Sequence, residues 1–275
     1  MIAPAIPETR DVQAFHPFLK LNRLLAEVPP GRAPTADGTP LALQIGEPQN
    51  DPPALLADSL NGAAGWNRYP PPRGTARFRQ ACHDWLARRH GAAAGAVDPE
   101  RHILPLPGTR EGLFFAALSA MRPGRDVILM PNPFYHVYAG AAVAAGATPV
   151  FVPATAASGF QPDYGALDPA LLDRAALAYL NTPANPQGAV ADTATLRAAI
   201  ALARRHDFVL ALDECYAEIY DTAPPPGGLD ALAHRGENGA TATAPLDNAP
   251  LANVVMFHSL SKRSSAPGLR CGFAC

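Results

Sequence analysis

The stretch FVLALDECYAEIY, residues 208–220, decides the fold of this chain. Its first half is a short apolar run of the kind that forms a strand buried on both faces, and the run ends in an acidic residue, Asp213. Four similar runs occur along the chain, namely DVILM (126–130), TPVFV (148–152), LAYLN (177–181) and VVMFH (254–258). Strands of this composition are typical of a mostly parallel sheet that helices cover on both sides.

Helical segments separate several of these strands. TREGLFFAALSAM (109–121) follows ILPLPG, and DTATLRAAIALARRHD (192–207) opens with Asp192 as a candidate helix cap. TARFRQACHDWLARRHG (75–91) ends in basic residues and a glycine, which suits the carboxyl end of a helix. The alternation predicts an α/β fold, and ligands of such folds bind at the carboxyl ends of the strands.

The composition indicates a globular protein with a small-molecule substrate. Of the 275 residues, 48% are hydrophobic and 17% are charged, and no apolar run approaches the ~18 residues of a membrane span. The formal net charge of -2 offers no basic field for nucleic acid. The N-terminus lacks the pattern of a secretory signal, so we expect a cytoplasmic protein. The four cysteines form no CxxC pair and no HExxH occurs, so we expect buried thiols and no metal site.

Two parts of the chain differ from the strand and helix pattern. Residues 1–40 contain the helix-like FHPFLKLNRLLAEV and a linker, and we assign them to an N-terminal arm and part of a small domain. Residues 41–275 are then the large domain. The low-complexity stretch 221–250 is long for a loop in a compact domain, so it is either a surface excursion or contains a helix.

The unusual polar residues follow the strands, at the points where the strands end. PLPGTRE (105–111) places a glycine and a hydroxyl at a helix start, where free N–H groups accept a phosphate. PNPFYHVY (131–138) supplies aromatic rings, and NTPANPQG (181–188) supplies an asparagine that can donate to an anionic oxygen. Asp213 and Lys262 complete the series. Each alone also fits an ordinary role as a turn, a packing ring, a helix cap or a solvated lysine.

Taken together, these strand ends supply what pyridoxal 5'-phosphate (PLP) requires of a protein. The cofactor needs a lysine to form a Schiff base, and a carboxylate to keep its pyridine nitrogen protonated as an electron sink. It also needs dipoles and hydroxyls that hold its phosphate. We therefore predict a PLP site in which Lys262 and Asp213 have the central roles.

The same motifs resemble a known family. GTRE, PNPFYHVY, NTPANPQG, DECYAEIY and SLSKRSSAPGLRCG together resemble the class I and II aminotransferases of PLP fold type I, from about Leu41 to Cys275. The resemblance implies a large domain with a mostly parallel, seven-stranded sheet between helices, and an incomplete small domain.

The resemblance also implies roles for individual residues. Lys262 would be the catalytic Schiff-base lysine, Asp213 the partner of the pyridine nitrogen and Tyr135 the ring that stacks on the cofactor. Asn185 and Tyr216 would donate to the ring oxygen, with Asn185 also near the substrate. The residues implied for the phosphate are Gly108, Thr109, Arg110, Ser259, Ser261 and Arg270.

A homodimer follows from the same resemblance. Tyr69 in NRYPPPRG matches a tyrosine that reaches the phosphate of the neighbouring subunit, and Gly46 in IGEP would lie beside the substrate carboxylate. The family's arginine for the substrate α-carboxylate has no match among these residues. We therefore expect the 275-residue chain to be a truncated form without efficient transamination.

Within the family, PNPFYHVYAGAA, DECYAEIY, FHSLSKRS and PGLRCGF are most similar to the N-succinyl-diaminopimelate aminotransferases of lysine biosynthesis. This implies a ping-pong exchange of an amino group between glutamate and N-succinyl-2-amino-6-oxopimelate. The sequence departs from the family's pattern at two places, and both bear on the identity of the substrate. Gln187 stands where the family's NPxG turn usually has threonine, and PPPRG (70–74) is richer in proline than the family's usual sequence.

Three alternatives remain open at this point. A PLP-dependent lyase or decarboxylase would need the same cofactor residues, and only the product distinguishes it. A regulatory protein that uses such a domain as a sensor would need a DNA-binding module, for which the first 40 residues are too short. An inactive fragment is the third alternative.

Overall fold

The computed structural model describes residues 17–28, 46–48, 50–233 and 251–275. The chain divides into two compact units, Met1–Glu47 and Pro48–Cys275. In the first unit, helix α2 (Pro17–Ala26) forms within the stretch that predicts a helix. The linker after it lies outside the described residues, and the assignment of residues 1–40 to a small domain stays a prediction.

The second unit is built on one seven-stranded sheet with the order β1-β7-β6-β5-β4-β2-β3. Its strands are β1 (Leu104–Leu106), β2 (Val127–Asn132), β3 (Thr148–Pro153), β4 (Ala175–Asn181), β5 (Val209–Asp213), β6 (Val254–Ser259) and β7 (Gly272–Ala274). The pairs from β3 to β6 are parallel, whereas β7 lies antiparallel between β6 and β1. The predicted α/β fold with a mostly parallel, seven-stranded sheet is confirmed.

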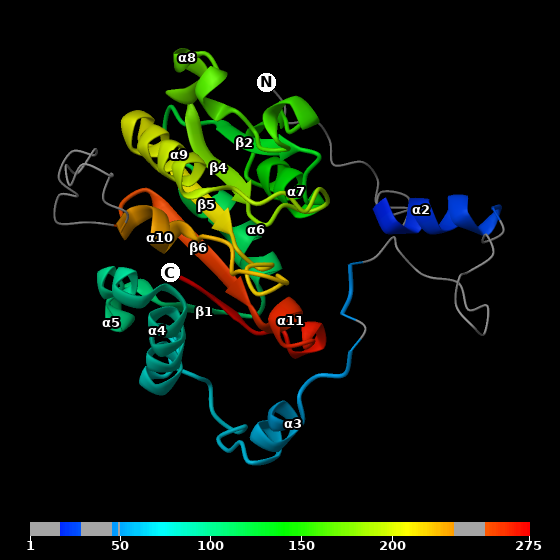
Figure 1. Ribbon diagram of the computed structural model, residues 1–275, viewed down its shortest axis with the longest axis vertical. Coiled ribbons are helices and arrows are strands. Elements are labelled where there is room, and N and C mark those ends of the chain that lie inside the picture. The colour runs from blue at the N-terminus through cyan, green and yellow to red at the C-terminus, as the bar shows by residue number, and fades with distance from the viewer. Residues whose placement is uncertain (1–16, 29–45, 49, 234–250) are drawn as a thin grey trace. The chain divides into compact units, whose positions relative to one another are not determined.

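Helices cover both faces of the sheet (Figure 1). Helices α6 and α7 pack on the face that carries Ala211, whereas α4, α9 and α10 pack on the face of Leu210 and Leu212, because side chains alternate along a strand. The helices of the second unit are α3 (Ala54–Asn61), α4 (Ala76–His90), α5 (Pro99–His102), α6 (Thr109–Ala120), α7 (His136–Ala144), α8 (Pro169–Leu172), α9 (Thr193–His206), α10 (Gly228–Ala233) and α11 (Leu260–Arg263). Short 3-10 turns are η1 (Gly91–Ala96), η2 (Ala156–Ser158), η3 (Tyr164–Ala166) and η4 (Pro267–Leu269).

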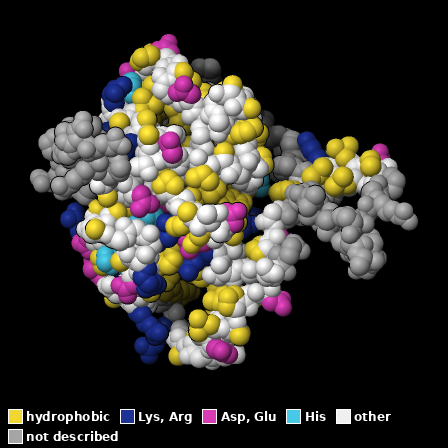
Figure 2. All heavy atoms as spheres, in the orientation of Figure 1, with side chains coloured by type: hydrophobic (Ala, Val, Ile, Leu, Met, Phe, Trp, Pro, Cys, Tyr) yellow, Lys and Arg dark blue, Asp and Glu magenta, His cyan; other side chains and the backbone are white. Residues whose placement is uncertain are grey.

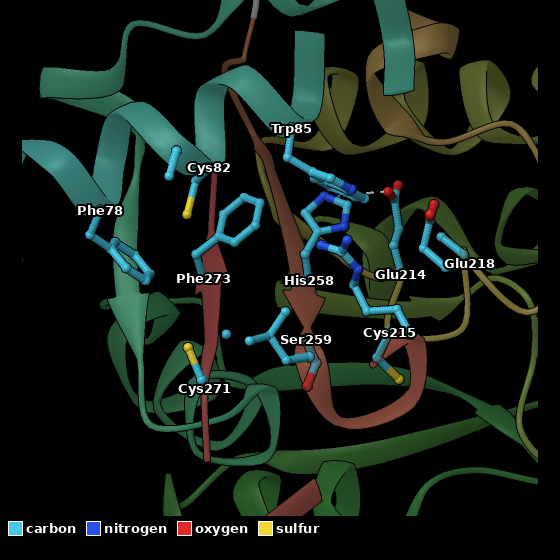
Figure 3. Close-up of a pocket in the computed structure, with 15 residues that line it drawn as sticks. Phe78, Cys82, Trp85, Glu214, Cys215, Glu218, His258, Ser259, Cys271 and Phe273 are labelled. Atoms are coloured by element: carbon cyan, nitrogen blue, oxygen red, sulfur yellow. Dashed lines mark ion pairs between the residues drawn. The ribbon is translucent and has the colours of Figure 1, made fainter. Parts of the chain in front are cut away.

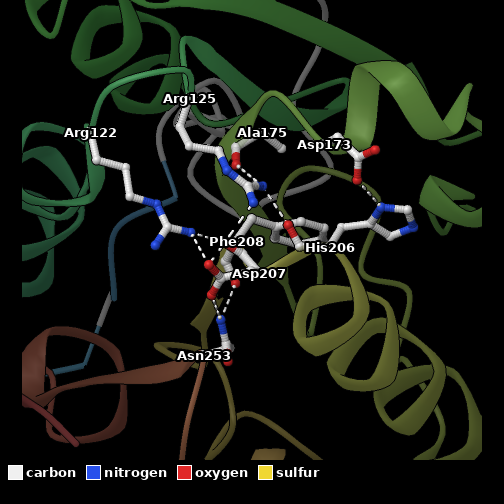
Figure 4. A network of polar contacts seen from close by, with 8 residues as sticks. All are labelled: Arg122, Arg125, Asp173, Ala175, His206, Asp207, Phe208 and Asn253. Carbon is white, nitrogen blue, oxygen red and sulfur yellow. Dashed lines mark hydrogen bonds and ion pairs between the residues drawn. The ribbon is translucent and has the colours of Figure 1, made fainter.

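Helix α9 shows how local sequence fixes an element. The Asp192 carboxylate accepts the Thr195 N–H at 2.7 Å, and hydrogen bonds of this kind hold the pKa of Asp192 below its usual range. At the other end Asp207 takes the left-handed conformation with φ 53°. Its carboxylate meets Arg122 Nη2 at 2.7 Å and Asn253 Nδ2 at 3.2 Å (Figure 4). This network joins the connections that lead into β2, β5 and β6, at the edge opposite their carboxyl ends.

The low-complexity stretch 221–250 contains helix α10, and residues 234–250 lie outside the described part. Among the described helices, none is long and apolar enough to cross a membrane. Acidic and basic side chains are interspersed over the face drawn in Figure 2, which agrees with the small net charge of -2.

Candidate active site

The carboxyl ends of β4, β5 and β6 meet at one edge of the sheet. These strands are parallel neighbours, and Asn181 pairs with Asp213 in register. Asn185, Tyr216 and Lys262 each follow the end of one of these strands within four residues. The fold therefore brings together the carboxylate, the amide, the phenol and the amine that the sequence singles out.

Asp213 is the buried acid of this edge, with an exposed fraction of 3%. The Tyr138 hydroxyl donates to its Oδ2 at 2.7 Å, and the Cys215 N–H donates to its Oδ1 at 3.3 Å. Burial raises the pKa of the Asp213 carboxyl above its usual value, while these two hydrogen bonds oppose the rise. The structure thus holds a carboxylate in place with a donor on each oxygen.

Asn185, Tyr216 and Lys262 form a polar group beside this carboxylate. Asn185 Nδ2 donates to the Tyr216 hydroxyl at 3.3 Å, and Lys262 Nζ lies 5.8 Å from the centroid of the Tyr216 ring. Asn181 orients the turn, because its Oδ1 accepts the Asn185 N–H at 2.6 Å and its Nδ2 donates to the Asp213 carbonyl at 2.7 Å. The backbones of the two strand ends are therefore linked through one buried amide.

A cradle suited to a dianion lies at the start of α6. Gly108 has φ 101°, and a Cβ built on it would lie 2.1 Å from Arg270 Nη2, so the guanidinium rests directly against this glycine. Arg270 Nη2 also meets Glu111 Oε2 at 2.8 Å. Helix N–H groups and a guanidinium are the donors that a phosphate needs. Gly108, buried Thr109 and Arg270 thus meet at one place.

The two predicted serines are close to each other at the end of β6. Ser259 Oγ accepts the Ser261 N–H at 3.0 Å and lies 2.9 Å from Ser261 Oγ. Gly272 pairs with Ser259 across the sheet, and a Cβ on Gly272 would lie 3.5 Å from the Thr109 methyl group. Ser259 and Thr109 therefore both lie beside Gly272.

Tyr135 and Arg110 interact with each other. Arg110 Nε donates to the Tyr135 hydroxyl at 3.0 Å, and this bond raises the pKa of the Arg110 guanidinium. The Tyr135 ring meets the Tyr138 ring edge-on, with centroids 5.6 Å apart. The Arg110 side chain binds Tyr135. The backbone N–H of Arg110, in the first turn of α6, is therefore the group of this residue that suits the predicted contact with the phosphate.

The roles of Gly46 and Tyr69 stay predictions. Gly46 belongs to the first unit and is exposed. Tyr69 precedes α4, and its side chain is fully exposed at 101%. An aromatic ring that its own chain leaves in solvent is compatible with a role in a neighbouring subunit.

Sequence reasoning missed three residues with clear positions at this site: Tyr138, Asn181 and Glu111. Tyr138 lies three residues after Tyr135, one helical turn along the same motif, and this spacing is the signal that could have found it. Asn181 and Glu111 are inside quoted motifs, but nothing in their spacing names the atoms that they contact.

A cavity of about 190 Å³ lies on the opposite face of the same strand ends. Figure 3 shows Glu214 and His258, which are next in sequence to Asp213 and Ser259, pointing toward each other beside Trp85. Burial raises the pKa of Glu214 to about 7 and lowers the pKa of His258 to about 3. The 3.6 Å contact between His258 Nε2 and Glu214 Oε2 is therefore not an ion pair at neutral pH.

The donor set fits PLP on the geometry of this structure. The lack of a Cβ on Gly108 lets the Arg270 guanidinium pack against the start of α6. The buried Asp213 carboxylate has donors that favour its charge, and the Lys262 amine lies beside the Tyr216 ring. A seven-stranded sheet of this order with these groups at one edge defines the class: a PLP-dependent protein of fold type I.

Comparison with known proteins gives the family. The chain belongs to the family "Aminotransferase class I and II", which matches residues 39–275. This confirms the resemblance predicted from the motifs, and it confirms PLP as the cofactor, on which this family depends.

Two curated relatives are LL-diaminopimelate aminotransferases. The protein of Moorella thermoacetica is 34% identical over 272 residues, which are 98% of this chain and 64% of the relative. The protein of Desulforudis audaxviator is 32% identical over 273 residues, which are 97% and 63%. The chain therefore spans a little under two thirds of the length of these relatives.

Solved structures agree in fold. An aminotransferase from Neisseria meningitidis is similar with a TM-score of 0.80 and 32% identity, over 96% of this chain and 65% of that chain. A probable N-succinyldiaminopimelate aminotransferase from Thermus thermophilus is similar with a TM-score of 0.66 and 30% identity, over 84% and 57%.

Proposed function

We propose that this chain is the PLP-binding part of an aminotransferase that moves an amino group between glutamate and an oxo acid. The observation that carries the proposal is the convergence of Lys262, Asp213 and the Asn185–Tyr216 pair at one sheet edge, next to Arg270 at the start of α6. Membership of the aminotransferase family supports it independently.

When bound, PLP supplies an electron sink for charge that develops at the substrate Cα. Lys262 would hold the cofactor by its amine and, once displaced, would take and return the proton at the Cα as a general base. Asp213 would keep a negative charge beside the pyridine nitrogen. Asn185 and Tyr216 would donate to the ring oxygen, and Arg270 with the first N–H groups of α6 would hold the phosphate.

For the acceptor we propose N-succinyl-2-amino-6-oxopimelate, in the route to diaminopimelate and lysine. The motifs around Tyr135, Asp213 and Lys262 support this, as does the similarity to the Thermus thermophilus structure. A second candidate substrate is LL-diaminopimelate without the succinyl group. The names of the curated relatives at 34% and 32% identity favour it. Both candidates place the chain in the same biosynthetic context.

Half-reactions separate these candidates. The PLP-loaded protein is mixed in turn with glutamate, N-succinyl-LL-diaminopimelate and LL-diaminopimelate, and the loss of the absorbance of the Lys262-bound cofactor is followed. We expect 2-oxoglutarate from glutamate, and conversion of the cofactor by the succinylated amine at least about tenfold faster than by LL-diaminopimelate. Faster conversion by LL-diaminopimelate than by its succinylated form would favour the second candidate over the first. Release of ammonia without 2-oxoglutarate would identify a lyase.

We also propose that the site is shared in a homodimer, with Tyr69 reaching the neighbouring subunit's phosphate. Its full exposure supports this. Tyr69→Phe and Lys262→Ala chains are prepared separately and then mixed under conditions that exchange subunits. If Tyr69 acts across the dimer, the mixture contains sites with both native residues and gains activity over either parent. If no gain follows confirmed exchange, Tyr69 does not act across the dimer.

A further inference from the structure

Two buried tyrosines form a stacked pair beneath Asp213. Tyr138 of α7 and Tyr179 of β4 are both 0% exposed, and their rings stack with centroids 4.1 Å apart and an angle of 9° between the planes. Their hydroxyls have different partners. Tyr138 donates to Asp213 Oδ2 at 2.7 Å, whereas Tyr179 donates to the Leu113 carbonyl at 2.7 Å.

We propose that Tyr138 is a positioning residue, which orients Asp213 and keeps the proton shared by Asp213 and the cofactor on the ring nitrogen. The inference rests on the proposed function, because it takes Asp213 as the partner of the pyridine nitrogen. It concerns one hydrogen bond between two residues of this chain that lie 75 positions apart.

The proton balance explains the effect. A carboxylate beside a pyridine nitrogen can exist as an anion next to a protonated ring, or as a neutral acid next to a neutral ring, with the same total of protons. A hydroxyl that donates to the carboxylate stabilises the anion more than the acid, because a hydrogen bond to a charged acceptor is the stronger one. Tyr138 therefore lowers the basicity of Asp213, and the ring nitrogen keeps the proton.

The surroundings fix the direction of this bond. Burial raises the pKa of Tyr138 well above its ordinary value, with a further rise from Asp213, so the hydroxyl remains a donor. Stacking on Tyr179 and the edge-on contact with Tyr135 confine the ring. The described titratable groups whose pKa values Asp213 raises are Tyr135, Tyr138 and Tyr179 from neighbouring elements, and Cys215 and Tyr216 from the segment after β5.

Tyr179→Phe is a matched control for Tyr138→Phe. Each change removes one hydroxyl from the same buried stack and leaves the rings in place, but only the second removes a donor to Asp213. The protein is loaded with PLP labelled with 15N at the ring nitrogen, and the chemical shift of that nitrogen is measured with the rate of the glutamate half-reaction.

We expect Tyr138→Phe to move the 15N shift toward that of unprotonated pyridine and to slow the half-reaction at least about tenfold. Tyr179→Phe should leave the shift at the native value, even where it lowers the melting temperature. A native shift in Tyr138→Phe would overturn the proposal. So would equal displacements in both variants, because these would indicate a packing effect.

A second variant keeps the shape of the ring. Incorporating 3,5-difluorotyrosine at position 138 makes the hydroxyl a stronger donor, so the 15N shift should move further toward the protonated form or stay there, and binding of PLP should persist. A move toward the unprotonated form would refute the inference even where Tyr138→Phe does not fold. Asp213→Asn tests the underlying function separately. An unchanged 15N shift in this variant would show that Asp213 is not the partner of the ring nitrogen, which would contradict the proposed function and not only the role of Tyr138.

Discussion

Replacing Gly108 by alanine tests whether the cradle at the start of α6 holds a phosphate. The backbone of Gly108 has φ 101° and ψ 154°, a region that is essentially restricted to glycine and costs other residues on the order of 1–3 kcal/mol. The added Cβ would lie 2.1 Å from Arg270 Nη2 and 2.7 Å from its Cζ. Ordinary contacts are about 3.5 Å, so the guanidinium must move by more than about 1 Å.

The clash should reduce affinity more than stability. The Arg270 side chain is 41% exposed and can move into solvent, so the unfolding free energy should fall by little beyond the backbone cost. A shift of this size breaks the contacts of Arg270 with Glu111 Oε2 at 2.8 Å and the Pro267 carbonyl at 3.0 Å. These two contacts are exposed and contribute little to stability, whereas a charge-assisted hydrogen bond from the guanidinium to a bound phosphate would contribute about 1.5–3 kcal/mol. We expect the Kd for PLP to rise at least about tenfold, since about 1.4 kcal/mol is a factor of ten.

Gly124→Ala is the matched control. Gly124 also has a positive φ, 77°, but a Cβ there would meet no atom of the described residues within 4 Å. Both variants should lose stability in urea unfolding, whereas only Gly108→Ala should lose affinity for PLP in a fluorescence titration. Pyridoxal, which lacks the phosphate, should bind both variants like the native protein. A PLP Kd within twofold of the native value in Gly108→Ala, or an equal loss in Gly124→Ala, would refute this reasoning.

Three further predictions concern Lys262, Asp213 and Glu214. Borohydride reduction of the PLP-loaded protein should fix the cofactor on the peptide that contains Lys262, and peptide mass spectrometry that finds it on another lysine would contradict the assignment. Asp213→Asn should retain PLP but slow proton abstraction, measured in single turnovers, by several orders of magnitude; a loss under about tenfold, or ~1.4 kcal/mol, counts against the role. Burial raises the pKa of Glu214 from 4.5 to about 7, so the unfolded chain releases this proton at a lower pH than the folded chain. The protonated Glu214 should therefore contribute stability that is fully present below pH 4.5 and is lost as the pH rises through 7. The unfolding free energy of the native protein relative to Glu214→Gln should therefore fall by a few kcal/mol between pH 4.5 and 8 in urea titrations, and a difference independent of pH would argue against the buried neutral acid.

The sequence by itself determined the strands, the helices and the chemistry at the strand ends. Apolar runs such as LAYLN and FVLALD are local patterns, and β4 and β5 form within a residue or two of them. The Asp192 cap and the glycine that ends α4 are equally local, since each depends on atoms a few residues away. Because strands of a parallel sheet end at the same edge, the predicted grouping of Asn185, Asp213 and Lys262 needed no knowledge of the strand order.

Only the tertiary structure decided which side chains contact each other across the chain. Tyr138 donates to Asp213 over 75 positions, and Arg270 meets Glu111 over 159 positions while resting against Gly108. The insertion of β7 between β6 and β1 brings Arg270 to the start of α6, and no local pattern specifies this strand order. Periodicity fixes which face of an element a residue occupies, but the partner on that face depends on which distant segment the packing of the whole core brings there.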